Sequence, residues 1–426
     1  MRDDVVEPGA GRVLPLTFGQ ADRWRAEGDH LNPIATLALG FLVTGSLDRD
    51  RLMRAMHLLT RRHPALTARL RRAAGGPVQV IGATSAEQLD VRSAGAATLD
   101  DATRRTGDVA LRLSDEHLFR VRLFDIEPDC HVVAVNVHHA VWDAVSDGIF
   151  ARELWSLYEG IALPPLSASY DQVVERQGAW IEAHGAARLQ TWSERLTRLP
   201  PPPALPRATP RTQVTSFRGD TISRSFPWEG SRFERARAAC GSGGAAGLAT
   251  LAIALRHLTG APEVALGVLL SDRLLYQARE QIGLFINTVP VRFADLDQYD
   301  DLEPAAAVDA LRLIADAYRW MLPRFMLAQE LIPGRAMAPY DITFNFISDQ
   351  GVPAVRRIGA LEIARLEIPR APSCLTQASE VWDGDNLWVN LSTDDERVAV
   401  DLLYNERFVS TDEATRLVTL MCDVAT

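Results

Sequence analysis

The sequence has few cysteines and little positive charge. Its four cysteines, Cys130, Cys240, Cys374 and Cys422, stand far apart and form no Cys-x-x-Cys pair. Neither a disulfide framework nor a zinc site is therefore indicated. The 45 basic residues are outnumbered by 55 aspartate and glutamate residues, which gives a formal net charge of -10 without any long basic run. This balance argues against binding to nucleic acids or anionic membranes.

Long apolar runs are missing as well. No window approaches the roughly 20 apolar residues that a membrane span needs, and the opening residues, MRDDVVEP, lack the apolar stretch of a signal peptide. We therefore expect a cytoplasmic protein without a membrane-bound part. The length of 426 residues, with 47% hydrophobic and 23% charged residues, is typical of a globular chain with two domains.

Strand-like and helix-like patterns are mixed in both halves of the chain, which predicts the α/β class. The clearest interruption is the proline-rich segment 199–212, which stays extended and stiff. We place the domain boundary there, between an N-terminal domain of residues 1–198 and a C-terminal domain of residues 213–426. Strands are predicted at 35–44, 118–126, 132–137, 263–270, 285–293 and 340–347, with a hairpin between 375–381 and 387–391. Helices are predicted at 246–258 and 305–321, after Asp48 with Leu52, Ala55, Met56 and Leu59 inward, and around Ile149, Phe150, Leu154, Leu157 and Tyr158.

One short motif carries the chemistry. His138 and His139 directly follow the predicted strand 132–137, and Asp143 stands four residues further on, where a helix should begin. Neighbouring side chains of a strand point to opposite faces, so one histidine should face substrate and the other the packing. A histidine can accept a proton near neutral pH, as acyl transfer to an amine or alcohol requires. The alternative is a structural histidine pair near a helix cap.

The motif and five further segments, taken in order, resemble the condensation domains of nonribosomal peptide synthetases and related acyltransferases. HHAVWDA at 138–144 is similar to the family's HHxxxDG signature. The other similar segments are LTFGQADRW at 16–24, RHPAL at 62–66, the stretch 170–180, SFRGD at 216–220 and IGLFINTVP at 282–290. The resemblance covers nearly the whole chain.

This resemblance implies two chloramphenicol-acetyltransferase-like subdomains in a V shape, with the active site in a central tunnel. His139, the second histidine of the motif, would be the catalytic residue beside His138. Asp143 would be structural and salt-bridged to an arginine, for which Arg273 is the candidate. The chain contains no adenylation, carrier or thioesterase segment. We therefore expect a free-standing, monomeric enzyme, and a peptidyl or acyl carrier protein would come in trans.

The predicted activity is that of an acyltransferase in natural-product biosynthesis. It would form an amide or ester bond between a carrier-bound acyl or aminoacyl thioester and a small-molecule or carrier-bound amine or alcohol. The enzyme itself would bind no cofactor and no metal, because the phosphopantetheine arm belongs to the carrier. Two alternatives stay open: a polyketide-associated O-acyltransferase that uses acyl-carrier or CoA donors, and a non-catalytic carrier-docking module.

Three residues are candidates for lining the tunnel, and each also has a structural interpretation. Ala144 replaces the signature's glycine, which is costly at a positive φ but harmless in the first turn of a helix; we favour the helix. Trp142 points either into the core or into the tunnel, where its indole would restrict the substrate. For Trp142 we favour the core, since large aromatic side chains are mostly buried. Asn287 either contacts substrate or holds a backbone turn, and we favour the turn.

Overall fold

The computed structural model forms two compact units, each described here by itself. It describes residues 11–28, 31–32, 35–83, 88–90, 95, 98–206, 208–209, 218–327, 340–347, 354–368, 386–394 and 396–426. The N-terminal unit contains Met1–Ala179, Asp272–Phe285 and Gln350–Gln377. The C-terminal unit contains Trp180–Ser271, Ile286–Asp349 and Ala378–Thr426.

This division differs from the contiguous one expected from the sequence. The chain changes unit after residue 179, ahead of the proline-rich segment, and two later segments return to the N-terminal unit. The first, 272–285, returns with Arg273, whose side chain is bonded to Asp143. The second returns because the strand β13 (Leu361–Leu366) pairs with β2 (Thr36–Thr44). Such pairing between distant segments leaves no trace in composition.

The N-terminal unit is built on a six-stranded sheet in the order β12-β13-β2-β7-β6-β5 and a small sheet in the order β1-β4-β3. Its pairs are antiparallel, except for the parallel pair β5 and β6. The remaining strands are β1 (Arg12–Pro15), β3 (Ala68–Ala73), β4 (Gly76–Ile81), β5 (Leu89–Asp90), β6 (Phe119–Glu127), β7 (Cys130–His138) and β12 (Val355–Ile358). Its helices are α1 (Phe18–Glu27), α2 (Arg49–Arg62), α3 (Leu99–Gly107), α4 (Ala144–Glu159), α8 (Arg273–Tyr276) and the first part of α5 (Tyr170–Leu196), with the 3-10 helices η2 (Pro64–Thr67) and η3 (His139–Val141).

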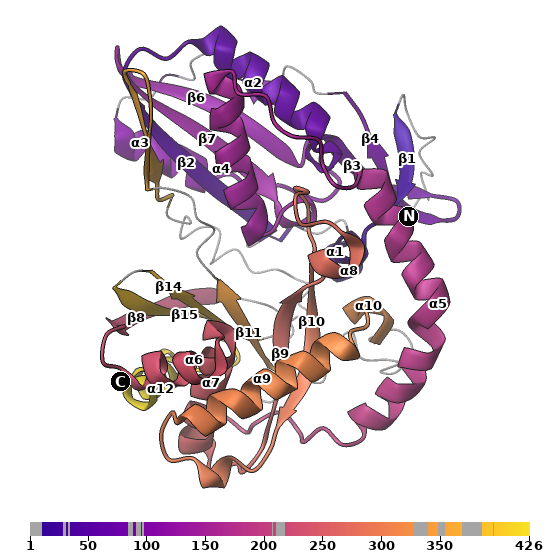
Figure 1. Ribbon diagram of the computed structural model, residues 1–426, viewed down its shortest axis with the longest axis vertical. Helices are drawn as coiled ribbons and strands as arrows, with labels where there is room; N and C mark the ends of the chain where they lie inside the picture. The colour runs from indigo at the N-terminus through magenta and orange to yellow at the C-terminus, as the bar shows by residue number, and fades with distance from the viewer. Residues whose placement is uncertain are drawn as a thin grey trace. The chain divides into compact units, whose positions relative to one another are not determined.

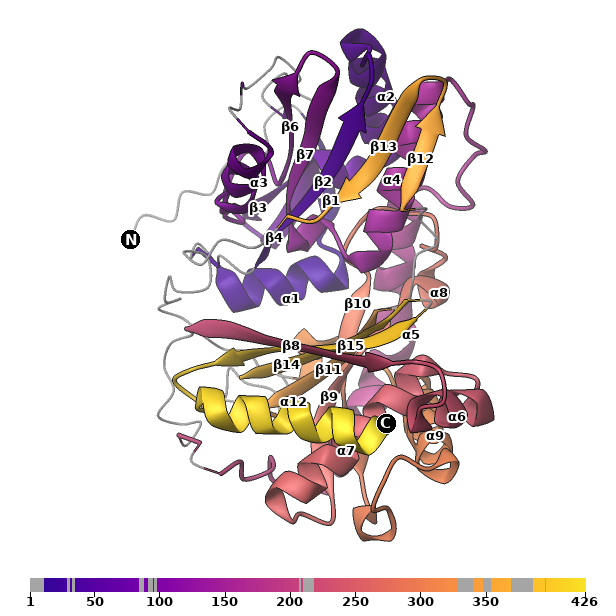
Figure 2. The ribbon, with the colours of Figure 1, turned by 90° about the vertical axis from the view of Figure 1, so that its left-hand side faces the viewer.

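Helices cover both faces of the large sheet of this unit, as Figures 1 and 2 show. α4 packs on one face, where Phe150 contacts the rings of Phe41 and Phe119, and α2 lies beside α4. α3 packs on the other face, where Ala102 joins a cluster with Phe124 and Val132. β7 is buried on both faces, so its end is a rigid place from which to present the motif.

The start of α2 agrees with its prediction from the sequence. Asp48 is the N-cap, and its side chain accepts a hydrogen bond from the backbone N–H of Arg51 at 2.9 Å. The core positions that the helical spacing predicted, namely Leu52, Ala55, Met56 and Leu59, are all buried. The N-cap satisfies a backbone N–H that has no partner within the helix, and the apolar face supplies the packing that stabilises it.

The C-terminal unit contains a six-stranded sheet in the order β10-β9-β11-β14-β15-β8. β11 pairs in parallel with both β9 and β14, and the other pairs are antiparallel. The strands are β8 (Gly219–Pro227), β9 (Val264–Ser271), β10 (Ile286–Phe293), β11 (Ile342–Ile347), β14 (Leu387–Thr393) and β15 (Arg397–Asn405). The helices are the second part of α5, α6 (Arg232–Cys240), α7 (Gly243–Thr259), the 3-10 helix η5 (Leu296–Gln298), α9 (Pro304–Arg319), α10 (Arg324–Met326) and α12 (Thr411–Ala425).

α7 is the central helix of the C-terminal unit. Its residues from Ala245 to Leu255 are all buried, as expected of a helix that is apolar on every side. It packs against α9, α6 and α12, which lie together on one face of the sheet in Figure 2. Gly247 allows the close approach to β11, because a Cβ there would lie 2.8 Å from the ring of Phe344.

The predicted strands and helices of this half lie at these elements, with ends that differ by a few residues. Of the predicted hairpin, residues 375–385 lie outside the described residues, and its second strand is β14, which pairs with β11 and β15. None of the helices in the described part of the chain combines the length and the apolar character needed to cross a membrane.

Candidate active site

The motif occupies the connection between β7 and α4. β7 ends at His138, η3 follows, and Asp143 is the N-cap of α4 with an extended backbone. The Asp143 carboxylate accepts a hydrogen bond from the backbone N–H of Ser146 at 3.0 Å, and Ser146 completes the capping box. The strand-to-helix turn predicted from the sequence is therefore present, and the cap fixes the position of Asp143.

His138 points into the packing of the N-terminal unit. It is fully buried, and its Nδ1 accepts a hydrogen bond from the backbone N–H of Ala140 at 3.1 Å. The ring proton is therefore on Nε2, which lies 3.1 Å from Oε2 of the buried Glu27. The hydrogen bond from Ala140 and complete burial fix the ring of His138, so His138 is the structural member of the pair.

His139 lies in a different environment from its neighbour. Its side chain is only half-buried, whereas its Nδ1 atom is buried and meets no hydrogen-bond partner among the described residues. Burial lowers the pKa of His139 to about 4, and the positive charge of Arg23 adds to this effect, although Asp143 and nearby backbone groups oppose it. The ring is therefore neutral at pH 7 and able to accept a proton.

Arg23 and Glu27, on α1, supply the charges beside the histidine pair. Arg23 Nη1 lies 3.3 Å from Glu27 Oε1, which also accepts a hydrogen bond from Asn32 at 3.2 Å. Burial acts to raise the pKa of Glu27, but His138 and Arg23 outweigh it, so this pKa lies below its usual value. The segment 16–24 was singled out from the sequence, but these roles of Arg23 and Glu27 were not.

The predicted ion pair between Asp143 and Arg273 is present within the N-terminal unit. Arg273 Nη2 lies 2.6 Å from Asp143 Oδ1, and both side chains are almost completely buried. The guanidinium also donates hydrogen bonds to backbone carbonyl oxygens within 272–285, at Ala278 (2.8 Å) and Gln281 (2.6 Å). Arg273 therefore joins the motif to the segment that carries it, and Asp143 is too enclosed to contact substrate in this structure.

The start of the IGLFINTVP segment also binds the motif through its backbone. Phe285 donates its N–H to Asp143 Oδ2 at 3.0 Å, and Gly283 donates its N–H to Ser146 Oγ at 3.1 Å. A Cβ at Gly283 would lie 2.6 Å from the ring of Phe285, so a glycine gives that ring its place within the segment. Sequence reasoning missed Ser146, although its place three residues after a helix cap is typical of a capping box.

Trp142 and Ala144 adopt the structural interpretations. Trp142 is fully buried, stacks on Phe119 and packs edge-on against Phe150. Its indole N–H donates to Asp147 Oδ1 at 2.6 Å, so the structure places this side chain among core residues of the unit, where the favoured interpretation expects it. Ala144 is the exposed first residue of α4 and has no positive φ. Its replacement of glycine therefore carries no backbone strain.

Asn287 belongs to the C-terminal unit, where it holds a backbone turn. Its amide N–H donates to the carbonyl oxygen of Leu322 at 2.8 Å, and its amide oxygen accepts from the N–H of Arg324 at 2.9 Å. The side chain is buried and both ends of its amide are bonded to this turn, as the favoured interpretation expects. The sequence candidates are thus brought together in the N-terminal unit, except for Asn287.

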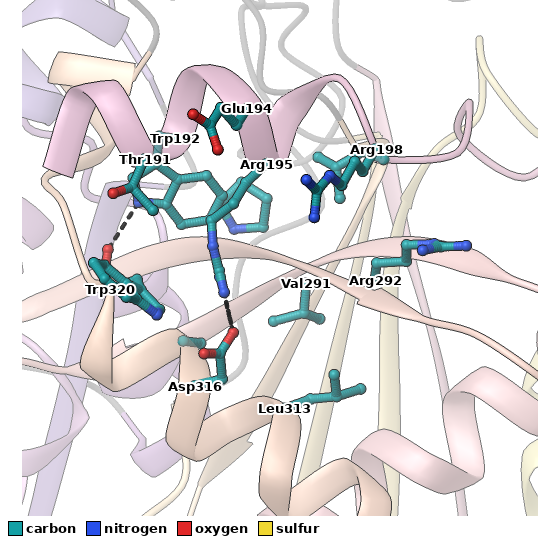
Figure 3. A pocket seen from close by; sticks show the side chains of 13 residues that line it. Thr191, Trp192, Glu194, Arg195, Arg198, Val291, Arg292, Leu313, Asp316 and Trp320 are labelled. Atoms are coloured by element: carbon teal, nitrogen blue, oxygen red, sulfur yellow. Dashed lines mark hydrogen bonds and ion pairs between the residues drawn. The ribbon is translucent and has the colours of Figure 1, made fainter.

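A separate groove of about 380 Å³ lies in the C-terminal unit, between α5, β10 and α9 (Figure 3). Arg195 pairs with Asp316 across it, and the Trp192 indole donates to the carbonyl oxygen of Trp320 at 2.8 Å. The side chains of Val291 and Leu313 face its open part. None of the site residues predicted from the sequence is among those that line this groove.

Comparison with known proteins places this geometry in a family. Residues 12–317 match the family model described as Condensation domain. Phosphinothricin tripeptide synthetase PhsB of Streptomyces viridochromogenes is 28% identical over 364 residues, which cover 80% of this chain and 30% of the synthetase. Surfactin synthase subunit 2 of Bacillus subtilis is 29% identical, and the match covers 60% of this chain and 7% of that protein. This chain thus spans less than a third of the length of these relatives.

Solved structures match over nearly the full length. The X-domain from teicoplanin biosynthesis has a TM-score of 0.76 at 21% identity, covering 98% of this chain and 96% of that one. The first condensation domain of the calcium-dependent antibiotic synthetase has a TM-score of 0.72 at 20% identity, covering 99% and 98%. The predicted α/β class with chloramphenicol-acetyltransferase-like architecture is thereby confirmed.

Proposed function

This chain belongs to the condensation-domain family, and we propose that it forms an amide or ester bond between a carrier-bound acyl or aminoacyl thioester and an amine or alcohol. The observation that carries this proposal is the state of His139. Its pKa of about 4 leaves it neutral at pH 7, and its side chain is half-buried at the end of a rigid strand. A neutral imidazole in that position is free to accept a proton, which general-base catalysis requires.

The reaction that we propose proceeds by direct acyl transfer. His139 accepts the proton of the amine or hydroxyl while its nitrogen or oxygen attacks the thioester carbonyl. The carbon–sulfur bond then breaks, and His139 returns its proton to the sulfur of the phosphopantetheine arm, which leaves as a thiol. The Asp143–Arg273 pair holds the turn that presents His139. Burial, with a further contribution from the charge of Arg23, lowers the pKa of His139 and keeps the ring neutral between turnovers. The first turn of α4 offers backbone N–H groups that suit a developing oxyanion.

We propose that the donor arrives on a separate carrier protein, with its phosphopantetheine arm as the only cofactor involved. The acceptor is a small molecule or a second carrier-bound group. A CoA thioester has the same reactive end as the carrier arm, so transfer from acyl-CoA is the alternative that experiment must separate. The retained His138–His139 pair supports an active enzyme over a docking module that only binds carriers.

The test is intact-protein mass spectrometry of acylated carrier proteins incubated with the chain and a panel of amines and alcohols. We expect loss of the acyl mass from the carrier and a matching gain on the acceptor, with the wild-type chain but not with His139→Ala. Transfer from acyl-CoA without any carrier would favour the O-acyltransferase. Binding of a carrier without acyl loss across the panel would overturn the proposal in favour of a docking module.

A further inference from the structure

A second buried histidine lies next to the candidate active site, outside the chemistry described above. His63 is the C-cap residue of α2 and the residue before η2, and its side chain is completely buried. It belongs to the RHPAL segment, which sequence comparison singled out without a role for its histidine. When both ring nitrogens of a buried histidine are hydrogen-bonded, the ring fixes the positions of the two groups that it contacts.

The two contacts of His63 define its tautomer. The backbone N–H of Ile282 donates to Nδ1 at 3.3 Å, so Nδ1 carries a lone pair and no proton. The ring proton is then on Nε2, which lies 2.7 Å from Oε2 of Glu153. The ionised carboxylate of Glu153 has no proton to donate and acts only as an acceptor. Arg62 donates to the same oxygen at 2.9 Å. The carboxylate therefore holds the ring with Nδ1 toward Ile282.

The charges around His63 favour this arrangement. Burial lowers the pKa of His63, with a further contribution from the cations Arg62 and Arg273, against the opposing effect of Glu153. Burial acts to raise the pKa of Glu153, but His63 and Arg62 outweigh it, and this pKa is lowered. The pair is thus a neutral imidazole that donates to a carboxylate, and Nδ1 stays available as an acceptor.

The backbone that His63 holds is the one that binds the motif. Ile282 is followed by Gly283, whose N–H donates to Ser146 Oγ, and by Phe285, whose N–H donates to Asp143 Oδ2. Residues 282–285 are therefore bonded at one end to His63 and at the other to the cap of α4. Glu153, on the same helix α4, closes the loop of contacts.

We propose that His63 is a positioning residue that fixes the backbone of 282–285 against the Asp143 cap and thereby sets the orientation of His139. Its effect on turnover rests on the proposed function, whereas its hold on the backbone does not. His63 touches no reacting atom. Its loss should lower kcat because a small displacement of a catalytic group can cost about 10²-fold, while KM changes little.

The test compares two variants that each keep one of the two contacts. The amide oxygen of Asn reaches the position of Nδ1, so His63→Asn retains an acceptor for the Ile282 N–H but loses Glu153. The longer Gln reaches the position of Nε2, so His63→Gln retains a donor to Glu153 but loses Ile282. Each loses one buried hydrogen bond, so a merely structural role would affect both variants alike.

Hydrogen exchange of the peptide that covers 282–285 is measured first, because it needs no substrate. We expect wild-type protection in His63→Asn and faster exchange in His63→Gln, with similar thermal stability in the two variants. On an acceptor that the wild type uses, kcat should fall about 10-fold to 100-fold in His63→Gln, with KM unchanged, and stay within a few-fold of wild type in His63→Asn.

Equal exchange and equal kcat in the two variants would overturn the proposal, as would faster exchange in His63→Asn than in His63→Gln. The same experiment separates the two levels of inference. If the wild type transfers no acyl group but the exchange difference holds, the proposed function fails and the positioning of 282–285 by His63 stands. If transfer is established and the variants do not differ, the positioning role fails alone.

Discussion

At the scale of single residues, the histidine pair shows how neighbours divide two tasks. His138 is the last residue of β7, and both of its ring nitrogens face partners in the interior. His139 begins η3, where the chain has left the strand, and the residue is only partly buried. Because the ring of His138 is fixed by its packing, the backbone at this position is fixed too, and this backbone sets the direction of the His139 side chain.

Replacement of His139 should remove most of the activity but leave the stability of the fold nearly unchanged. We expect His139→Ala to lower turnover by a factor on the order of 10²–10⁴, as for loss of a general base, because no other described side chain takes its place. Turnover is measured on an acceptor that the wild type uses, and His57→Ala, which changes an exposed histidine of α2, is the matched control. Near-normal turnover of His139→Ala would remove the assignment.

The pH dependence of the reaction should reflect the lowered pKa of His139. A base must be unprotonated, so kcat/KM falls only when the pH drops through the pKa of free His139, which is about 4 instead of the usual 6.5. We therefore expect activity to be flat from pH 7 down past pH 6, as far as the carrier stays folded. An acid limb centred at 6.5 or above would show that the ring is solvated and that Arg23 does not act on it.

Trp142 should act on stability instead of specificity. It is fully buried among Phe119 and Phe150, and removal of a large core aromatic costs about 3–5 kcal/mol. We expect Trp142→Ala to lose roughly that much in urea denaturation, and the half-buried Trp228→Ala, as a control, to lose less. A Trp142→Ala protein with wild-type stability and a broader substrate range would restore the tunnel interpretation.

These residues also show what a sequence can and cannot predict. The pairing of Asp143 with Arg273 was expected from the resemblance to condensation domains, in which the motif aspartate is salt-bridged to an arginine, and the two side chains are bonded in the structure. The direction of Trp142 stayed open because the turn after β7 breaks the alternation of strand side chains, and only the packed rings decide it. Glu27 and His63 had no assigned role, because His138, Glu153 and Ile282 come from segments that no local pattern connects to them. Ser146 was missed although its capping box with Asp143 is a local pattern.

At the scale of elements, the junction of β7 and α4 depends on a charged group at its cap. The Asp143 carboxylate accepts from Ser146 within α4 and from Phe285, and it pairs with Arg273 of α8. The N-terminus of a helix favours a negative charge. The cap therefore stabilises α4 and holds 272–285 at the same time.

Loss of one partner of this ion pair should destabilise the fold strongly, and loss of both should cost less than the sum of the two single losses. Asp143→Ala leaves a buried guanidinium, and Arg273→Ala leaves a buried carboxylate, so each should cost about 3–5 kcal/mol. The double variant should cost clearly less than the sum of the two, with the difference measured in urea denaturation as a double-mutant cycle. Additive costs, or single losses below 1 kcal/mol, would contradict a coupled buried pair.

Elements that depend on local rules were predictable, and those that depend on distant pairing were not. The start of α2 follows from Asp48 as its cap and from four apolar residues at helical spacing. β12 and β13 escaped prediction because Leu361–Leu366 is short and half-buried and obtains its place only from pairing with β2. The strand β11 was expected at 340–347, but its parallel pairing with β9 and β14 was not.

At the scale of the whole molecule, the N-terminal unit cannot be cut out as a continuous piece. Two of its parts, 272–285 and 350–377, come from beyond the proline-rich segment. The first brings Arg273 to the buried Asp143, and the second brings β13 to the open edge of β2. Both a buried charge without its partner and an unpaired strand edge are costly.

A fragment of residues 1–198, which the sequence alone would mark as a domain, should therefore fail to fold cooperatively. It retains the histidine motif but lacks Arg273, the Ile282 partner of His63 and the strand β13. We expect no sharp thermal transition in near-ultraviolet circular dichroism, whereas the full chain unfolds in one or more cooperative steps. Co-expression with residues 199–426 is the control, because it supplies the missing segments on a second polypeptide. Recovery of a cooperative transition only in the co-expressed pair would support the discontinuous unit, and a fragment 1–198 that melts cooperatively near the temperature of the full chain would contradict it.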